Sequence, residues 1–224
     1  MKYVKEFIAA LLPQLLLLTV CLLVIFVTQC TPAYAGTIPS AAERHRNTLV
    51  RAAHWGFGMD APISTMAAQV HQESRWQTDA RSPVGAQGLA QFMPATAQWM
   101  PEVDRSLSNP DPYNPGWALR AMVRYNVWLL ERVQAESPCE SWAMALSAYN
   151  GGLSWVNRDR ALALASGASG LAWFDHIEQH NAGRSAANFH ENRQYVRVVL
   201  FTFEPLYHRH GWGPGVCIGR SEQW

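Results

Sequence analysis

The chain has 224 residues and a formal net charge of +1, and 49% of its residues are hydrophobic while 16% are charged. A chain of this length can bury one sizeable core, and its hydrophobic content is too high and its charge too low for a disordered protein. The near-neutral charge also argues against a nucleic-acid partner, because electrostatic binders of nucleic acid usually have a basic face and a high pI.

The first 35 residues have the pattern of a secretory leader. Two lysines precede an apolar run over residues 7–27, and small residues (Ala-Tyr-Ala) at 33–35 suit a signal peptidase. We therefore expect cleavage after Ala35 and export to the periplasm. Because the apolar run exceeds the usual roughly 7–15 residues, an uncleaved anchor is the alternative, and only then is the membrane a partner. A lipid on Cys30 is less favoured, since a bulky glutamine precedes it.

Helical patterns dominate the chain beyond the leader. A capping-box sequence at residues 40–43 predicts a helix to about residue 54, Pro62 begins a second helix, and Asn114 followed by proline begins a third. Further helices are expected at residues 140–150, 171–180 and 191–207, loops at 77–87 and 101–113, and a helix end or a loop at 161–170. Convincing alternating strands are absent. The sequence therefore predicts a mainly α fold, or α+β at most with a very small sheet.

Two cysteines, Cys139 and Cys217, lie beyond the leader. An even number of cysteines in an oxidising compartment favours a disulfide, so we expect these two to be bridged. Two buried free thiols are the alternative.

Glu73 is the first candidate for chemistry. It shares a helix face with Met66 and Val70, and a carboxylate on an apolar face is desolvated, which raises its pKa. A glutamic acid that stays protonated near neutral pH can serve as a general acid. The alternative is a buried structural glutamate that pairs with an arginine such as Arg75 or Arg193.

Three further segments combine polar side chains with helix ends. Residues 85–94 join a loop to a helix start, where glycines let the backbone approach a ligand and Gln91 offers both a donor and an acceptor. Residues 148–152 (Ala-Tyr-Asn-Gly-Gly) end a helix with a phenol and an amide that can face a cleft. Residues 191–196 (Glu-Asn-Arg-Gln-Tyr-Val) open the last long helix. Each segment alone is a weak signal.

In order and spacing, Glu73-Ser74, Gly-Leu-Ala-Gln at 88–91, Ala-Tyr-Asn-Gly-Gly at 148–152 and the 191–196 segment resemble the four motifs of the soluble lytic transglycosylase (SLT) family. The resemblance covers roughly residues 60–206 and implies a lysozyme-like fold. Ala90 stands where the family usually has methionine, which leaves the shape of a sugar subsite in doubt. Asn192 and Gln194 stand where threonine and asparagine are usual.

The resemblance implies cleavage of the β-1,4 bond between N-acetylmuramic acid and N-acetylglucosamine in peptidoglycan, leaving a 1,6-anhydro end without water. Glu73 would protonate the glycosidic oxygen and then, as carboxylate, take the proton of the muramic C6 hydroxyl. Ser74 and Tyr149 would support Glu73. The expected substrate-binding residues are Gly88, Gln91, Met93, Asn150 and Tyr195.

A single carboxylate suits this chemistry. Most glycosidases use two, but the resemblance implies that the substrate's own hydroxyl is the nucleophile. Glu191 is the other acid in a motif position, and we expect it to cap or anchor its helix. No cofactor or metal is expected: His176 and His180 have an i, i+4 spacing but lack the metalloprotease pattern.

The expected organisation is a signal peptide or anchor at 1–35, an N-terminal helix at 36–59, a catalytic domain at 60–207 and a tail at 208–224. Beyond peptidoglycan, the resemblance implies a conjugation or secretion apparatus as a candidate partner, because small members of the family often accompany machinery that needs the wall opened locally. A hydrolytic muramidase on the same fold, or a non-catalytic peptidoglycan-binding component of an envelope machine, are the alternatives.

Overall fold

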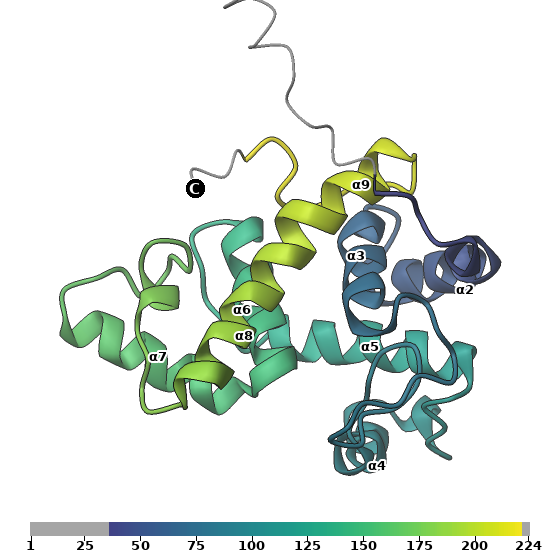
Figure 1. Ribbon diagram of the computed structural model, residues 1–224, viewed down its shortest axis with the longest axis horizontal. Coiled ribbons are helices and arrows are strands. Elements are labelled where there is room, and N and C mark those ends of the chain that lie inside the picture. Colours follow the sequence, from purple (N-terminus) through teal and green to yellow (C-terminus); the bar gives the residue numbers. More distant parts are fainter. Residues whose placement is uncertain (1–35, 221–224) are drawn as a thin grey trace, which may run out of the picture. The chain divides into compact units, whose positions relative to one another are not determined.

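The computed structural model describes residues 36–220 (Figure 1), so the predicted leader, its anchor alternative and Cys30 lie outside the described residues. Residues from Ile38 onward form one compact unit. Its helices are α2 (Ser40–Phe57), α3 (Ile63–Ser74), α4 (Pro94–Val103), η1 (Arg105–Leu107), α5 (Pro115–Leu130), α6 (Pro138–Gly151), α7 (Leu153–Ala165), η2 (Ile177–Gln179), α8 (Ala186–Arg197), η3 (Val198–Phe203) and α9 (Glu204–Arg209).

The prediction of a mainly α fold is confirmed. Between residues 36 and 220 the chain forms no strand, and the loop before α4 contains two isolated bridges, Arg81 to Gln87 and Gln87 to Phe92. Within the same range, no helix is long and apolar enough to cross a membrane.

Local capping explains where two helices begin. The Asn114 side chain accepts from the backbone N–H groups of Gly116 and Trp117 at 2.9 and 3.1 Å, and proline follows at the first helical position. Ser137 caps α6 in the same way, by accepting from the N–H of Glu140. The predicted capping box at residues 40–43 does not form, because α2 begins after Pro39 without a side-chain cap.

The expected helix at 171–180 is wrong. This segment forms turns and the short 3₁₀ helix η2, because the buried carboxylate of Glu140 accepts from the N–H groups of Trp173 and Phe174 at 2.6 and 3.1 Å. These donors therefore bond a distant residue instead of a helical ladder. α4 begins at Pro94, where the sequence indicated a helix start, and it contains Pro101 near its end, within the stretch predicted to be a loop. For α7 the sequence indicated a helix end or a loop at 161–170, but it predicted no helix over residues 153–160.

The long C-terminal helix crosses the centre of the unit. It consists of α8, the π-helical segment η3 and α9 without interruption, and Figure 1 shows it running past α3. The other side of α3 packs against α2. Most residues of α3 are consequently buried, from Ile63 to His71 without a break. This central packing places Glu73, in the last turn of α3, next to the C-terminal helix.

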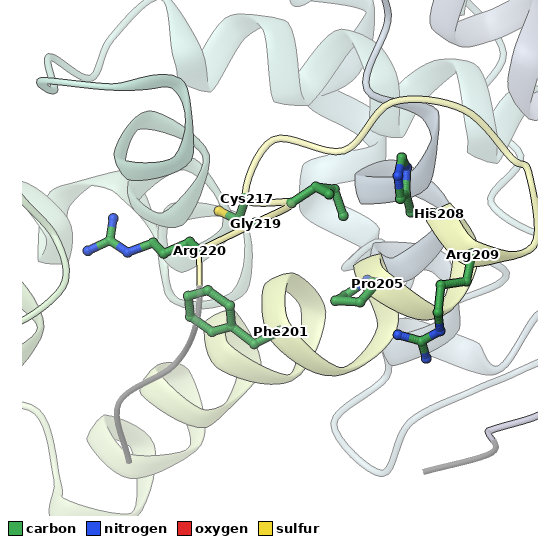
Figure 2. A pocket seen from close by; sticks show the side chains of 8 residues that line it. Phe201, Pro205, His208, Arg209, Cys217, Gly219 and Arg220 are labelled. Atoms are coloured by element: carbon green, nitrogen blue, oxygen red, sulfur yellow. The ribbon is translucent and has the colours of Figure 1, made fainter. Parts of the chain in front are cut away.

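A disulfide holds the C-terminal segment. Cys139, at the start of α6, and Cys217 are bonded, with their Cα atoms 5.0 Å apart. Glu204 fixes the same segment from α9: it accepts from the Thr65 hydroxyl at 2.5 Å and from the Cys217 N–H at 2.7 Å. Figure 2 shows Phe201 on the helix beside this segment, at a hollow of about 400 Å³ that shares no lining residue with the groove around Glu73.

Candidate active site

A groove of about 280 Å³ opens over the C-terminal end of α3. All four motif segments contribute to its walls together with α4 and α5. The lining residues are Glu73, Ser82, Val84, Ala86, Gln91, Phe92, Met93, Thr96, Tyr125, Tyr149, Asn150 and Glu191. The structure therefore brings together Glu73, Gln91, Met93, Tyr149 and Asn150 of the predicted site.

An abrupt turn in the backbone leaves Glu73 at the groove. After Ser74 the chain adopts left-handed conformations at Arg75 (φ 52°) and Trp76 (φ 65°), which non-glycine residues seldom adopt. Trp76 is buried and donates its indole N–H to the Tyr207 hydroxyl at 2.6 Å, which holds the turn in place. The helix ends where its acid reaches the groove.

The surroundings of Glu73 favour its protonated form. Burial raises its pKa from 4.5 to about 8, and the hydrogen bond that the Tyr195 hydroxyl donates to Oε1 at 2.5 Å only partly opposes this rise. The structural alternative, a pairing with arginine, is contradicted: Arg193 pairs with Asp159 at 2.8 Å, and Arg75 forms no ion pair with any acid in the described part of the chain. Burial therefore favours the neutral form of Glu73 near pH 7.

Ser74 and Gly88 support the loop rather than the acid or the sugar. The Ser74 hydroxyl donates to the carbonyl of Leu89 at 2.8 Å, so it does not orient Glu73 directly as expected. Gly88 lies outside the groove lining and has φ +70°, and a Cβ there would lie 1.7 Å from the carbonyl oxygen of Pro112. Both residues fix the loop that carries Gln91.

Gln91 presents an acceptor to the groove. Its side-chain N–H₂ donates to the carbonyls of Gly88 at 2.8 Å and Ala80 at 3.3 Å. Its Oε1 atom has no donor among the described residues, so this oxygen is available to a ligand. Ala90 is buried, and Met93 is exposed at the groove lining.

Tyr149 forms the floor beside the acid. Its hydroxyl donates to the carbonyl of Ala90 at 2.8 Å, and its ring contacts those of Phe92 and Tyr125 with centroids 6.0 and 5.2 Å away. Burial and the nearby Glu73 raise the pKa of this phenol, so it stays neutral. The aromatic floor helps to desolvate the acid.

The fourth motif has a different role from the one expected. Tyr195 is buried and contacts Glu73 instead of lining the groove. Glu191 does not cap α8, because the helix begins five residues earlier with Ser185 as its cap, and Glu191 instead lies exposed in the groove wall. Sequence reasoning placed no role on Asn192, whose Nδ2 donates to Asn150 Oδ1 at 2.8 Å.

His176 and His180 form hydrogen bonds with residues of the segment that follows α7. His176 accepts from the N–H of Ser169 at 3.1 Å, and a ring nitrogen of His180 lies 2.7 Å from the Ser166 hydroxyl. No group of three or more His, Cys, Asp or Glu side chains within residues 36–220 is arranged to hold a metal ion.

The fold and the groove together define a helical domain with a desolvated acid, Glu73, at its groove. The model of the transglycosylase SLT domain matches residues 49–170, more than half of the chain. The chain belongs to this family.

Several known proteins are similar to the chain. A membrane-bound lytic murein transglycosylase F from Shewanella halifaxensis is 30% identical over 146 residues, which are 65% of this chain and 28% of that protein. The corresponding protein from Shewanella pealeana is 37% identical over 112 residues, which are 49% of this chain and 22% of that protein. The chain thus spans about a quarter of the length of these curated relatives.

Solved structures share the fold. An inactive mutant of lytic transglycosylase Slt from Pseudomonas aeruginosa has a TM-score of 0.57 at 26% identity, covering 86% of this chain and 28% of that one. The 70 kDa soluble lytic transglycosylase from Escherichia coli has a TM-score of 0.53 at 23% identity, covering 76% and 25%.

Proposed function

We propose that the chain is a peptidoglycan lytic transglycosylase with Glu73 as general acid and then general base. The carrying observation is the Glu73 carboxyl, which faces a groove and stays protonated at neutral pH because burial raises its pKa to about 8. Membership of the SLT family and the printed activity of the similar relatives support the same substrate class.

The hydrogen bond from Tyr195 makes the two carboxyl oxygens of Glu73 different from each other. Because the Tyr195 hydroxyl donates to Oε1, we assign the proton of the neutral acid to Oε2. In the first step this proton moves to the glycosidic oxygen while the bond from that oxygen to the muramic C1 breaks. In the second step the muramic C6 oxygen bonds to C1, and its proton passes to the Glu73 carboxylate. The acid is regenerated, and no water is consumed.

Product analysis tests the proposal. Purified protein is incubated with peptidoglycan, and the released fragments are identified by mass spectrometry. We expect 1,6-anhydro ends from the wild type and a loss of roughly a hundredfold or more in rate for Glu73→Gln, because the variant has no proton to donate. Unchanged digestion by Glu73→Gln would contradict the assignment and favour a non-catalytic wall-binding protein.

Glu191 makes the matched comparison, because it is the other carboxylate in the groove. A transglycosylase needs no second carboxylate, so Glu191→Gln should retain turnover and 1,6-anhydro products. Reducing muramic ends from the wild type, together with inactivity of Glu191→Gln, would establish the hydrolytic alternative.

The activity should also depend on pH through Glu73. The first step needs the protonated acid, so kcat/KM should fall about tenfold per pH unit above a pKa of about 8. A decline that begins near pH 4.5 instead would show that the acid is not desolvated.

The biological setting follows as a finer proposal. The leader-like residues 1–35 and the disulfide support an exported protein that acts on the wall outside the cytoplasm. There it would open peptidoglycan locally for a conjugation or secretion apparatus. Deletion of the gene should lower transfer or secretion, and complementation with the Glu73→Gln variant should fail to restore it. Normal transfer in the deletion strain would remove this role.

A further inference from the structure

Asn150 stands where two hollows meet. It lines the groove around Glu73 and also an adjoining hollow of about 400 Å³, which Trp155, Arg184 and Glu191 line with it. Asn150 is exposed, and its amide can offer either oxygen or N–H₂ to a ligand. Which of the two faces the ligand depends on what holds the other end of the amide.

The partners of Asn192 determine its own orientation. Its Oδ1 accepts from Arg193 Nη1 at 2.8 Å and from Arg184 Nη1 at 3.2 Å. Guanidinium groups only donate, so the atom that faces them must be the oxygen. Its Nδ2 donates to the backbone carbonyl of Ser147 at 2.9 Å, which can only accept. If the Asn192 amide were flipped, its N–H₂ would face the N–H groups of the two arginines, and its oxygen would face the carbonyl oxygen of Ser147.

A buried carboxylate keeps both arginines in place. Asp159 is 0% exposed, and its Oδ2 accepts from Arg193 Nη2 at 2.8 Å and pairs with Arg184. Charge-assisted bonds of this kind are stronger than neutral ones and define the geometry of the group. Asp159 therefore fixes the arginines, and the arginines fix the oxygen of Asn192.

The fixed orientation of Asn192 in turn determines the orientation of Asn150 at the groove. Asn192 Nδ2 donates to Asn150 Oδ1 at 2.8 Å, so the oxygen of Asn150 is turned toward Asn192 and one of its lone pairs is used. Its Nδ2 has no partner among the described residues and is left for the ligand. We propose that Asn192 is a positioning residue that holds the oxygen of Asn150 and leaves its N–H₂ for the ligand, selecting a ligand with a carbonyl acceptor such as the acetamido group of an amino sugar.

Glycine at 151 leaves room for this arrangement. A Cβ at Gly151 would lie 2.9 Å from Asn192 Nδ2 and 3.3 Å from Arg184 Nη1. Threonine at 192 could not replace the amide, because one hydroxyl cannot accept from two arginines and also donate to two oxygens. The asparagine that departs from the usual family motif thus has a specific use here.

Binding tests the inference, which rests on the proposed function only for the class of sugar. All variants are made in the Glu73→Gln background, so that binding is measured without cleavage. The probe is an oligomer of N-acetylglucosamine, and the comparison is the same oligomer without acetyl groups, with calorimetry giving both dissociation constants. Asn192→Asp places a carboxylate against Asn150, which should rotate its amide and point its oxygen into the groove.

We expect Asn192→Asp to raise the dissociation constant of the acetylated oligomer about tenfold, the equivalent of one ordinary hydrogen bond. The ratio between acetylated and deacetylated oligomers should fall by the same factor. Asn150→Asp should act alike, since its carboxylate still accepts from Asn192 and offers no donor. It also serves as the second variant if Asn192→Asp does not fold.

A double-mutant cycle separates positioning from general structure. If Asn192 acts through Asn150, Asn192→Asp should add nothing once Asn150→Ala has removed the amide. An equal loss in both backgrounds would overturn the inference. Gln194→Glu is the matched control, because it makes the same amide-to-carboxylate change at an exposed position of α8, and it should leave binding unchanged. With Glu73 restored, Asn192→Asp should also keep the wild-type pH midpoint of activity.

Discussion

Replacing Glu73 with glutamine should make the fold more stable at neutral and alkaline pH. Glutamine retains an oxygen that can accept from the Tyr195 hydroxyl, but it has no proton to lose. In the wild type, the carboxyl has a pKa of 4.5 when unfolded and about 8 when folded. The folded state therefore binds more protons between these values, and stability falls as the pH rises through this window.

The magnitude follows from the same two values. The loss is about 1.4 kcal/mol per pH unit inside the window, so the wild type should lose about 3 kcal/mol between pH 4.5 and pH 7 through this one group. This is an upper value, because the side chain is partly exposed in the groove and water reduces the penalty.

Urea unfolding of both proteins across pH 4 to 9, with the disulfide intact, measures the effect. The difference in unfolding free energy between Glu73→Gln and the wild type cancels other titrating groups and should grow from pH 4.5 to 8. A difference that stays flat across this range would show that Glu73 is ionised in the fold, and the reasoning about the general acid would fail.

Three further predictions concern the frame of the site. Cys139→Ser should cost about 4 kcal/mol of unfolding free energy, because the bond to Cys217 closes a loop of 78 residues; a melting temperature unchanged by reduction would contradict this. Asp159→Asn should cost about 3–5 kcal/mol of unfolding free energy, since two buried arginines lose their counter-charge; a urea unfolding midpoint equal to that of the wild type would contradict this. Gly88→Ala should lower both stability and activity, because its Cβ meets the Pro112 carbonyl, and wild-type thermal unfolding would refute the clash.

Local chemistry made part of the fold and site predictable. Asn114 and the proline after it mark a helix start that their own backbone contacts produce. The position of Glu73 on an apolar face predicted the desolvation that raises its pKa. The segment at 171–180 was not predictable in this way, because Glu140, more than thirty residues earlier, takes its backbone donors.

The orientation of the last helix was also beyond the reach of sequence. Tyr195 was expected to contact the sugar, and Glu191 to cap the helix. In the structure α8 begins at Ala186, so both side chains lie in the middle of a helix, one facing the acid and the other the groove. Only the packing of α8 reveals which face points inward, and the Asn192 contact depends on the same packing.

The π-helical segment η3 sets the phase between the two ends of this helix. Tyr195 lies before Val198–Phe203 and aims at the acid, whereas Glu204 lies after it and aims at Thr65 and Cys217. A π turn takes up roughly one residue more than an α turn, and one residue corresponds to about 100° of rotation. With regular α geometry throughout, either the tyrosine or the glutamate would point away from its partner. The π-helical segment therefore lets one continuous helix direct Tyr195 to Glu73 and Glu204 to Thr65 and Cys217.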